Sequence, residues 1–248
     1  MRPYKAYIFD LDGTLFRGDE PIDGAVETVL ELERRGAIIR YLTNNSTRTR
    51  EFFTDKLRRM GYPASPEEVY TSGLGTAKFL SASGVTAAFV VGEEGLKDTI
   101  RAYGIHVRDA DVQAVVVGLS KQFTYELMNQ AMQLIRSGAR FIATNPDPTY
   151  PVEGGGLIPG AGSVVAAVRT CSEQEPFVVG KPNPYLVELV MQESNLSPAE
   201  VLVVGDRLDT DLESGARAGC DTFLVLSGVT EVAPNGQAHA EDLRGMIA

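Results

Sequence analysis

Two aspartates one residue apart, Asp10 and Asp12, are the residues of this sequence best suited to chemistry. They follow the apolar run 7–9 and lead into Gly13. Two neighbouring carboxylates repel and shift each other's pKa apart, so the pair favours a bound cation, a shared proton, or one nucleophile beside one acid. A divalent metal together with a phosphate ester would satisfy all three. The alternative is a solvated turn, because Asp and Gly are common in turns for local reasons.

Three further polar clusters follow apolar segments of strand length. They are Thr43-Asn44, Lys181, and the run from Asp206 to Asp211. Side chains that follow parallel strands meet at one edge of the sheet, where open α/β folds bind their ligands. Each cluster alone is weak evidence, since a strand-ending Asp or Thr is often a helix cap. Taken with the first aspartate pair, they predict one shared site.

Apolar runs alternate with helical patterns along the chain, which predicts an α/β fold with a largely parallel sheet. The two outer segments, 1–84 and 176–248, each look too small for a full sheet, so we expect them to form one core domain. Residues 85–175 are expected to be an inserted, smaller α/β domain. The predicted strands are 5–10, 38–42, 69–71, 87–91, 114–118, 140–144, 177–179, 201–205 and 222–226. Residues 15–22 are expected to form a hairpin flap over the aspartates, and Ser46 to cap the following helix.

Composition excludes several other classes of protein. The chain has 248 residues, of which 44% are hydrophobic, so it can bury a sizeable core. A net charge of −10 without a basic run argues against nucleic acid or an anionic membrane as partner. Two cysteines without a CxxC pair argue against a disulfide framework or a zinc site. The first strand comes early and no 18-residue apolar stretch occurs, so we expect a cytoplasmic protein without signal peptide or membrane span.

The four clusters, in this order, resemble the motifs of haloacid dehalogenase (HAD) superfamily phosphatases. The matching segments are DLDGT at 10–14, TNNS at 43–46, GKP at 180–182 and GDRLDTD at 205–211. The insertion between the second and third motifs resembles the type-two cap of the branch that holds p-nitrophenylphosphatase, pyridoxal phosphatase, phosphoglycolate phosphatase and ribonucleotide phosphatases. The resemblance covers essentially the whole chain. It implies a Rossmann-like HAD core with an α/β cap domain, and a phosphomonoesterase that acts on a small phosphorylated metabolite.

The residue types of the clusters fit phosphoryl transfer, which needs a nucleophile, charge neutralisation and a proton for the leaving oxygen. Asp10 is the candidate nucleophile and would form an aspartyl-phosphate intermediate. Asp12 is the candidate acid for the leaving group and then the base for the hydrolytic water. Thr43, the backbone N–H of Asn44, and Lys181 are expected to bind phosphate oxygens.

The resemblance also implies a Mg²⁺ site. In it, Asp206 binds the cation together with the Asp10 carboxylate and the Asp12 main-chain carbonyl, and hard oxygen ligands are those that Mg²⁺ prefers. Asp211 is expected to lie outside this set and to orient a metal-bound water. Asp209 is equally acidic, but capping of the following helix is its expected role.

Substrate specificity is expected in the cap, because the four clusters address only the phosphate. The irregular loop 145–151 has the character of a functional loop, and Asn145, Asp147 and Tyr150 are its candidate substrate-binding residues. Tyr150 stands where pyridoxal phosphatases usually have a histidine, which makes vitamin B6 phosphate a less favoured substrate. Lys121 either meets a second anionic group or is an exposed lysine without a role. The resemblance also leaves open a homodimer formed through the cap.

Other functions use related residues. A receiver-like, phospho-accepting module also combines acids, Thr and Lys around Mg²⁺, but its aspartate follows a middle strand and it lacks a second domain. A phosphate-ligand-binding protein without turnover would not need to retain Asp10, Asp12, Lys181 and Asp206 together. A dehalogenase or phosphonate hydrolase on the same fold would not need Asp12 as an acid.

Overall fold

The computed structural model describes residues 3–151 and 156–247, and the chain divides into two compact units. The first, called the core unit here, comprises Met1–Thr43, Arg50–Tyr70 and Lys181–Ala248. The second, called the inserted unit, comprises Asn44–Thr49 and Thr71–Gly180. In the part of the chain that the structure describes, no helix is long and apolar enough to cross a membrane.

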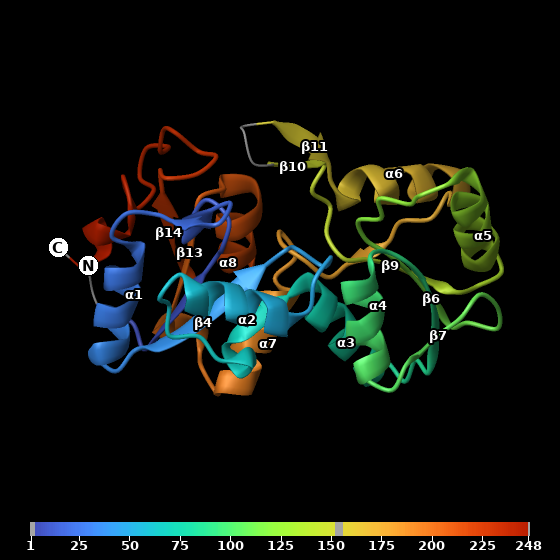
Figure 1. The fold of residues 1–248 in the computed structure, drawn as a ribbon, viewed down its shortest axis with the longest axis horizontal. Helices are drawn as coiled ribbons and strands as arrows, with labels where there is room; N and C mark the ends of the chain where they lie inside the picture. Colours follow the sequence, from blue (N-terminus) through green and yellow to red (C-terminus); the bar gives the residue numbers. More distant parts are fainter. Residues whose placement is uncertain (1–2, 152–155, 248) are drawn as a thin grey trace. The chain divides into compact units, whose positions relative to one another are not determined.

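The core unit is built on a sheet with the order β15-β14-β13-β1-β4-β5 (Figure 1). In this order its strands are His239–Ala240, Asp221–Val225, Val201–Gly205, Ala6–Phe9, Ile38–Thr43 and Val69–Thr71. The central strand β1 pairs in parallel with both β13 and β4, and β14 pairs in parallel with β13 and β15. Every residue of β1 and β13 is buried, as expected of central parallel strands covered on both faces. The carboxyl ends of β1, β4 and β13 therefore lie at one edge of the sheet.

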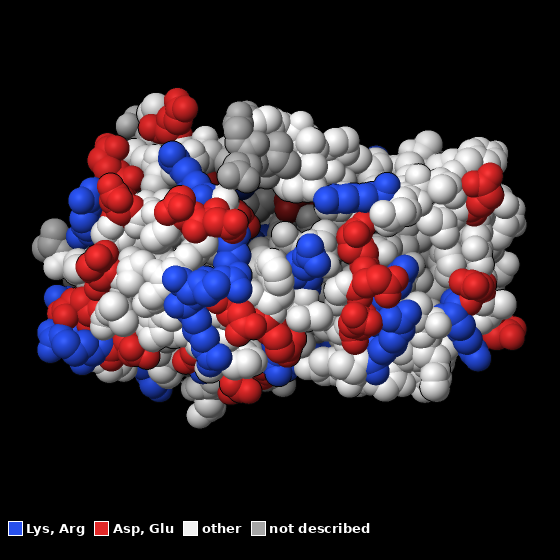
Figure 2. Space-filling view, viewed as in Figure 1, with Lys and Arg blue, Asp and Glu red and all other residues white. Residues whose placement is uncertain are grey.

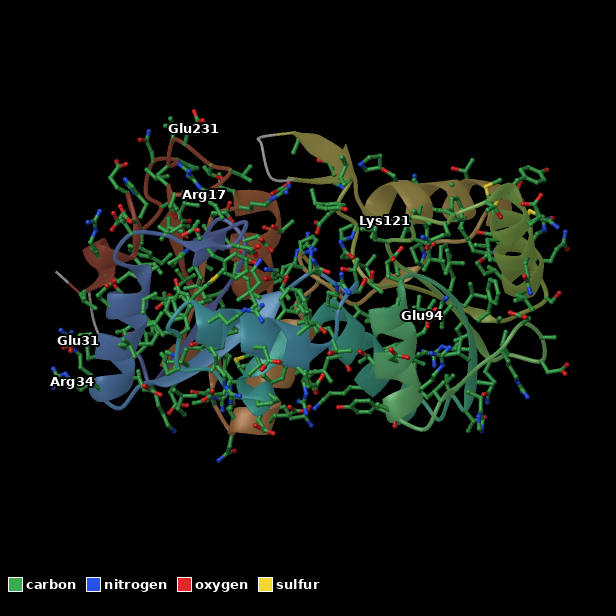
Figure 3. All side chains as sticks on the ribbon, viewed as in Figure 1. Arg17, Glu31, Arg34, Glu94, Lys121 and Glu231 are labelled. Atoms are coloured by element: carbon green, nitrogen blue, oxygen red, sulfur yellow. The ribbon has the colours of Figure 1, made fainter. Side chains whose placement is uncertain are left out.

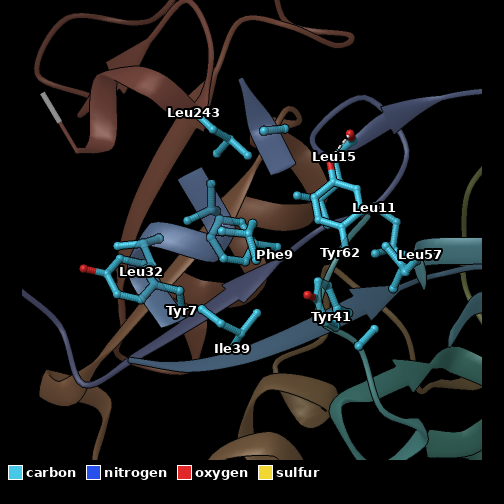
Figure 4. Packing of buried hydrophobic residues seen from close by; sticks show 14 of the residues in the cluster. Tyr7, Phe9, Leu11, Leu15, Leu32, Ile39, Tyr41, Leu57, Tyr62 and Leu243 are labelled. Carbon is cyan, nitrogen blue, oxygen red and sulfur yellow. Dashed lines mark hydrogen bonds between the residues drawn. The ribbon is translucent and has the colours of Figure 1, made fainter. Parts of the chain in front are cut away.

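Helices and turns connect these strands. They are α1 (Ala25–Arg34), α2 (Arg50–Arg59), α7 (Tyr185–Ser194), α8 (Glu213–Arg217), a π-helical turn (Leu208–Leu212), and short 3₁₀ turns at Pro66–Glu68, Pro198–Glu200 and Leu243–Met246. The expected hairpin is present as β2 (Phe16–Arg17) and β3 (Glu20–Pro21), which pair antiparallel. Apolar faces of α1 and α2 close the core, with Val29, Leu32 and Leu57 buried among the aromatic rings of the sheet (Figure 4).

The inserted unit has its own parallel sheet with the order β12-β9-β8-β6-β7. In this order its strands are Phe177–Val178, Arg140–Ala143, Ala114–Val117, Ala87–Val91 and His106–Val107. Its helices are α3 (Ser72–Ala82), α4 (Glu94–Ala102), α5 (Tyr125–Arg136) and α6 (Ala161–Ser172), and α3 packs on α4 while α5 packs on α6 (Figure 1). An antiparallel hairpin of β10 (Thr149–Pro151) and β11 (Leu157–Pro159) lies between β9 and α6 in the sequence.

The fold class predicted from the sequence is confirmed, while the division of the chain differs from the expected 1–84, 85–175 and 176–248. Helix α3 belongs to the inserted unit because it packs on α4. Strand β12 was expected in the core sheet, and this was wrong: it pairs with β9, and Phe177 stacks on Phe79 with ring centroids 4.4 Å apart. An apolar run shows that a strand is buried but does not show which sheet it joins.

Local details also differ from the expectations. Helix α2 begins at Arg50, so Ser46 does not cap it; Ser46 is buried and donates to the Thr144 hydroxyl. The sequence further predicts a helix over 210–218, which is present as a π-helical turn that continues into the short α8. It also predicts a loop over 145–160 with a turn at 154–156; the structure has the β10–β11 hairpin in this range, and the turn falls largely outside the described residues.

Surface charge agrees with the composition. On the face shown in Figure 2, basic side chains are interspersed with acidic ones. On α4, Arg101 pairs with Glu94 and Asp98, and Lys97 also pairs with Glu94. On α1, Glu31 binds Arg34 and Arg35 (Figure 3).

Tyr62 provides a test of the core unit, because its buried hydroxyl donates to the Leu15 carbonyl at 2.6 Å at the start of the flap (Figure 4). Tyr62→Phe should lower the free energy of unfolding by about 0.5–1.5 kcal/mol, since it removes one buried hydrogen bond while the Leu15 carbonyl keeps the Ile22 N–H at 2.9 Å. Tyr125→Phe is the matched control, because Tyr125 is 75% exposed. Urea denaturation of both variants would show the difference, and equal effects would contradict this account.

Candidate active site

Asp10 stands at the carboxyl end of β1, where the sequence placed it. Its N–H donates to the Val204 carbonyl at 2.9 Å, which continues the ladder between β1 and β13 by one residue. The chain then turns at Gly13, which has a φ of +90°. A Cβ at Gly13 would lie 2.5 Å from Oδ2 of Asp206, so both the backbone conformation and the available space require glycine. The turn thus brings the backbone of the first motif against the carboxylate of the fourth.

Lys181 joins two of the predicted acids. Its Nζ lies 2.5 Å from Oδ1 of Asp10 and 2.5 Å from Oδ1 of Asp211, and it also donates to the Leu42 carbonyl at 3.3 Å. The lysine side chain is only 3% exposed. A buried ammonium is costly unless it is paired and hydrogen-bonded, and these three acceptors meet that requirement. The lysine is therefore a fixed positive charge beside Asp10.

Asp206 completes an acidic cluster with Asp10 and Asp211. One carboxylate oxygen from each lies within 4.8 Å of the others, a spacing suited to a metal ion. Oδ2 of Asp206 accepts the Val229 N–H at 2.6 Å. Oδ1 is buried and has no hydrogen-bond partner among the residues that the structure describes. A buried carboxylate oxygen without a donor requires a cation or a proton. The environment of Oδ1 of Asp206 is therefore the feature of this cluster that most favours a bound metal ion.

Crowding of the acids shifts their protonation. Burial and the charge of Asp211 raise the pKa of Asp206 to about 7. Burial, with the charges of Asp211 and Asp206, raises the pKa of Asp10 well above its ordinary value, although Lys181 opposes the shift. Burial disfavours the charged form of Lys181, but the neighbouring Asp10 and Asp211 more than offset this and raise its pKa. The three carboxylates and one ammonium carry two excess negative charges when ionised, which a divalent cation would balance.

Asp12 lies in a different environment. Its side chain reaches the surface, yet protein surrounds it closely enough that desolvation raises its pKa, while the charge of Lys56 opposes this. Lys56, on α2, has its Nζ 4.3 Å from the centre of the Phe16 ring and 3.2 Å from Asp19 of the flap. Lys56 is not predictable as a neighbour of Asp12 from the sequence, because a single lysine on an amphipathic helix carries no motif.

The second motif contributes to both units. Thr43 is buried at the end of β4 in the core unit. Asn44, the next residue, belongs to the inserted unit, where its Nδ2 donates to both oxygens of Asp147 at 3.3 and 3.1 Å. Its carbonyl accepts the Ser72 hydroxyl at 2.5 Å. The side chain of Asn44 is thus fixed from the inserted unit, and its backbone follows directly on β4.

The candidate specificity residues are partly brought together in the inserted unit. Asn145 donates to Oδ2 of Asp147 at 2.9 Å and accepts the Thr144 hydroxyl at 2.8 Å. Tyr150 lies further along, in β10. Lys121 is exposed, and its backbone N–H donates to Glu93 (Figure 3). Asp147 therefore organises the two asparagines.

Asp209 was expected to cap the following helix, but it does not. Its exposed carboxylate pairs with the Arg207 guanidinium at 3.1 Å, within the π-helical turn. That turn instead directs Asp211 inward, where Oδ2 accepts the Arg207 N–H at 3.1 Å and Oδ1 meets Lys181. A Cβ at Gly205 would lie 2.3 Å from the Cβ of Asp211, so the glycine before Asp206 makes this approach possible.

The aspartates clustered around a buried lysine at the strand ends of a parallel sheet are typical of α/β enzymes with a carboxylate-based active site. Comparison with known proteins supports this class. Residues 7–106 match the family model described as haloacid dehalogenase-like hydrolase, and residues 178–244 match the one described as HAD-hydrolase-like. The chain is 41% identical over 232 residues to an acid sugar phosphatase of Staphylococcus aureus. The aligned residues cover 93% of this chain and 89% of the relative.

Solved structures show the same fold. A p-nitrophenyl phosphatase from Archaeoglobus fulgidus matches with a TM-score of 0.93 and 33% identity over 99% of each chain. A glycerol phosphate phosphatase from Mycobacterium tuberculosis, determined in complex with magnesium, matches with a TM-score of 0.87 and 34% identity over 97% of this chain and 76% of that one. The chain belongs to the haloacid dehalogenase family of hydrolases, among its phosphatases with an inserted α/β cap.

The raised pKa of Asp206 predicts how the metal-free protein responds to pH. The pKa of Asp206 is raised from an ordinary value of 3.8 to about 7 in the folded chain. Between these values the folded chain keeps a proton that the unfolded chain has released. In excess chelator, the free energy of unfolding should therefore fall as pH rises from about 4 to about 7, by up to about 1.4 kcal/mol per pH unit for one proton. Above about 7 this contribution should level off.

Denaturation with urea across this pH range would measure the effect. Asp206→Asn cannot titrate at this position, so its fall should be shallower than that of the wild type, with the remaining slope due to Asp10 and Asp12, whose pKa values are also raised. Identical slopes for the two proteins would show that Asp206 does not take up the proton.

Proposed function

We propose that this protein is a Mg²⁺-dependent phosphomonoesterase that hydrolyses a small phosphorylated metabolite through an aspartyl-phosphate at Asp10. The observation that carries the proposal is the buried Lys181 between Asp10 and Asp211, beside the unpartnered oxygen of Asp206. The relatives named acid sugar phosphatase and glycerol phosphate phosphatase favour the phosphate of a sugar or a small polyol as substrate.

The acidic cluster fits Mg²⁺ in charge and in ligand type. Asp10 and Asp206 would hold the cation with their carboxylates and Asp12 with its main-chain carbonyl, a set of hard oxygens with room for water. When bound, the cation would neutralise charge on the transferring phosphoryl group. Asp211 binds Lys181 and the Arg207 N–H, which leaves it a supporting role beside this set.

The first step transfers the phosphoryl group to the protein. A carboxylate oxygen of Asp10 attacks phosphorus in line, and the bond from phosphorus to the substrate oxygen breaks. The Lys181 ammonium lies on the Asp10 carboxylate and opposes its protonation, and a bound cation would act in the same direction. Asp12, whose raised pKa favours the protonated form, donates its proton to the leaving oxygen.

The second step restores the enzyme. Asp12, now ionised, accepts a proton from a water that attacks phosphorus, and the bond from phosphorus to Asp10 breaks to release inorganic phosphate. Thr43 and the Asn44 backbone N–H donate to the phosphate oxygens, and the Lys181 ammonium balances their charge. The hydrogen bonds from Asn44 to Asp147 support this placement, because they fix the residue whose backbone is needed.

Specificity is proposed to come from the inserted unit, where Asn145, Asp147 and Tyr150 remain the candidate contacts for the leaving group. The polar network around Asp147 offers amide and carboxylate groups of the kind that bind sugar hydroxyls. A homodimer through this unit and a cytoplasmic location stay predictions.

A phosphate-ester panel with and without Mg²⁺ tests the proposal. The wild type should release inorganic phosphate from sugar and polyol phosphates with Mg²⁺ and lose this activity in excess chelator. Asp10→Asn should abolish turnover and keep the fold, because the substitution is nearly isosteric and removes the nucleophile. Full activity in chelator, or activity of a folded Asp10→Asn protein within tenfold of the wild type, would refute the mechanism.

Asp12 should be distinguishable from Asp10 by its dependence on the leaving group. Asp12→Asn should lose about 10²–10⁴-fold in kcat/KM on a sugar phosphate, the usual contribution of a general acid, because kcat/KM reports phosphoryl transfer to Asp10 and not the hydrolysis step that all substrates share. It should lose far less on p-nitrophenyl phosphate, whose phenolate needs little protonation. Steady-state kinetics on both esters decides, and equal losses would reject Asp12 as the leaving-group acid.

A further inference from the structure

The segment 227–230, which follows β14, contacts both Asp206 and the turn after Asp10. The Val229 N–H donates to Oδ2 of Asp206 at 2.6 Å, and the Thr230 N–H donates to the Asp206 carbonyl at 3.2 Å. The Ser227 hydroxyl donates to the Gly13 carbonyl at 2.8 Å. The segment therefore binds two catalytic motifs that lie about two hundred residues apart in the sequence.

The packing of this segment on Asp206 leaves no room for a side chain. A Cβ at Gly228 would lie 2.0 Å from Oδ2 of Asp206, and a Cβ at Gly13 would lie 3.2 Å from the Gly228 Cα. The Asp206 carboxylate is thus enclosed by two glycine backbones. The Val229 N–H binds Oδ2, and this hydrogen bond fixes the rotation of the Asp206 carboxylate. Oδ1 is left as the oxygen without a hydrogen-bond partner among the described residues.

The flap is attached to the same segment. The Arg17 guanidinium of β2 donates to the Ser227 carbonyl, with its Nε at 2.9 Å (Figure 3). The Asp12–Phe16 bridge and the Gly13 N–H to Phe16 carbonyl bond join the flap in turn to the first motif. The segment, the flap and the aspartate turn consequently form one hydrogen-bonded assembly around Asp206.

We propose that residues 227–230 position Asp206 for a divalent cation, with the Val229 N–H fixing the carboxylate and Ser227 holding the Gly13 backbone against it. The inference rests on the proposed function in that it takes Asp206 as a ligand of the cation. Hydrogen bonds to ligating carboxylates typically affect metal affinity by about 10–100-fold. The contribution of Val229 is made by its backbone, and its side chain is 61% exposed.

Substitutions at Val229 separate the N–H from the side chain. Val229→Pro removes the N–H, and Val229→Ala keeps it. We expect Val229→Pro to raise the Kd for Mg²⁺ at least tenfold and Val229→Ala to leave it within twofold of the wild type. Calorimetric titration of the substrate-free chain with Mg²⁺ measures both. The Mg²⁺ concentration for half-maximal phosphatase activity should rise in parallel, with kcat recovering at high Mg²⁺.

Substitutions at Ser227 give a second comparison. It tests the inference even in the case that the Val229→Pro variant does not fold. Ser227→Ala removes the hydroxyl that binds Gly13, and Ser227→Thr retains one. The alanine variant should bind Mg²⁺ about threefold or more weakly, and the threonine variant should bind like the wild type. Urea denaturation in chelator shows whether each variant is folded and how stable it is without metal.

The outcomes separate this inference from the proposed function. If the wild type binds Mg²⁺ and both Val229→Pro and Ser227→Ala bind equally well, the positioning role is overturned while the phosphatase proposal stands. Lower metal-free stability with unchanged Mg²⁺ affinity would likewise overturn it, because that is the signature of a purely structural segment. A wild type that does not bind Mg²⁺ would overturn the metal assignment itself and this inference with it.

Discussion

The ion pairs of one buried lysine organise the core unit of this protein. Lys181 lies between Asp10 and Asp211, at 2.5 Å from each, in surroundings that exclude nearly all water. Removing the lysine would leave two buried carboxylates without their cation, which is far more costly than losing a surface pair. The sheet supplies Asp10, the π-helical turn supplies Asp211, and the return of the chain from the inserted unit supplies the lysine. The need to satisfy this ammonium therefore constrains three distant parts of the sequence at once.

The excess of acid over base follows from the same arrangement. One lysine cannot balance three carboxylates, and burial together with this excess of negative charge raises the pKa values of Asp10 and Asp206. Perturbed pKa values of this kind are common at functional sites. Desolvation also raises the pKa of Asp12, but there no neighbouring carboxylate adds to the shift and Lys56 opposes it. Two aspartates separated by one residue thus have different electrostatic surroundings.

Much of the arrangement of the candidate site residues could be predicted from the sequence, because these residues stand at or just after the ends of strands. Asp10, Thr43 and Asp206 end β1, β4 and β13, and parallel strands bring such residues to one edge. Lys181 does lie beside Asp10, as expected, although the strand before it, β12, belongs to the other sheet. Lys56 and the segment 227–230 were beyond reach, because a helix face and a backbone N–H leave no pattern in residue types. Ser46 was expected to cap a helix but makes a tertiary contact with Thr144, and Asp209 pairs instead with its sequence neighbour Arg207.

Two of the points at which the chain passes between its two units involve candidate phosphate-binding residues. These are the crossings after Thr43 and before Lys181. Gly180 cannot be enlarged there, since a Cβ would lie 2.5 Å from the Asn44 side chain and 2.6 Å from the Thr144 carbonyl. A protein engineer who wished to exchange the inserted unit for that of a relative would therefore have to transplant it with these junctions unchanged. Within that boundary, the fold permits the inserted unit to change in sequence while the core unit stays the same.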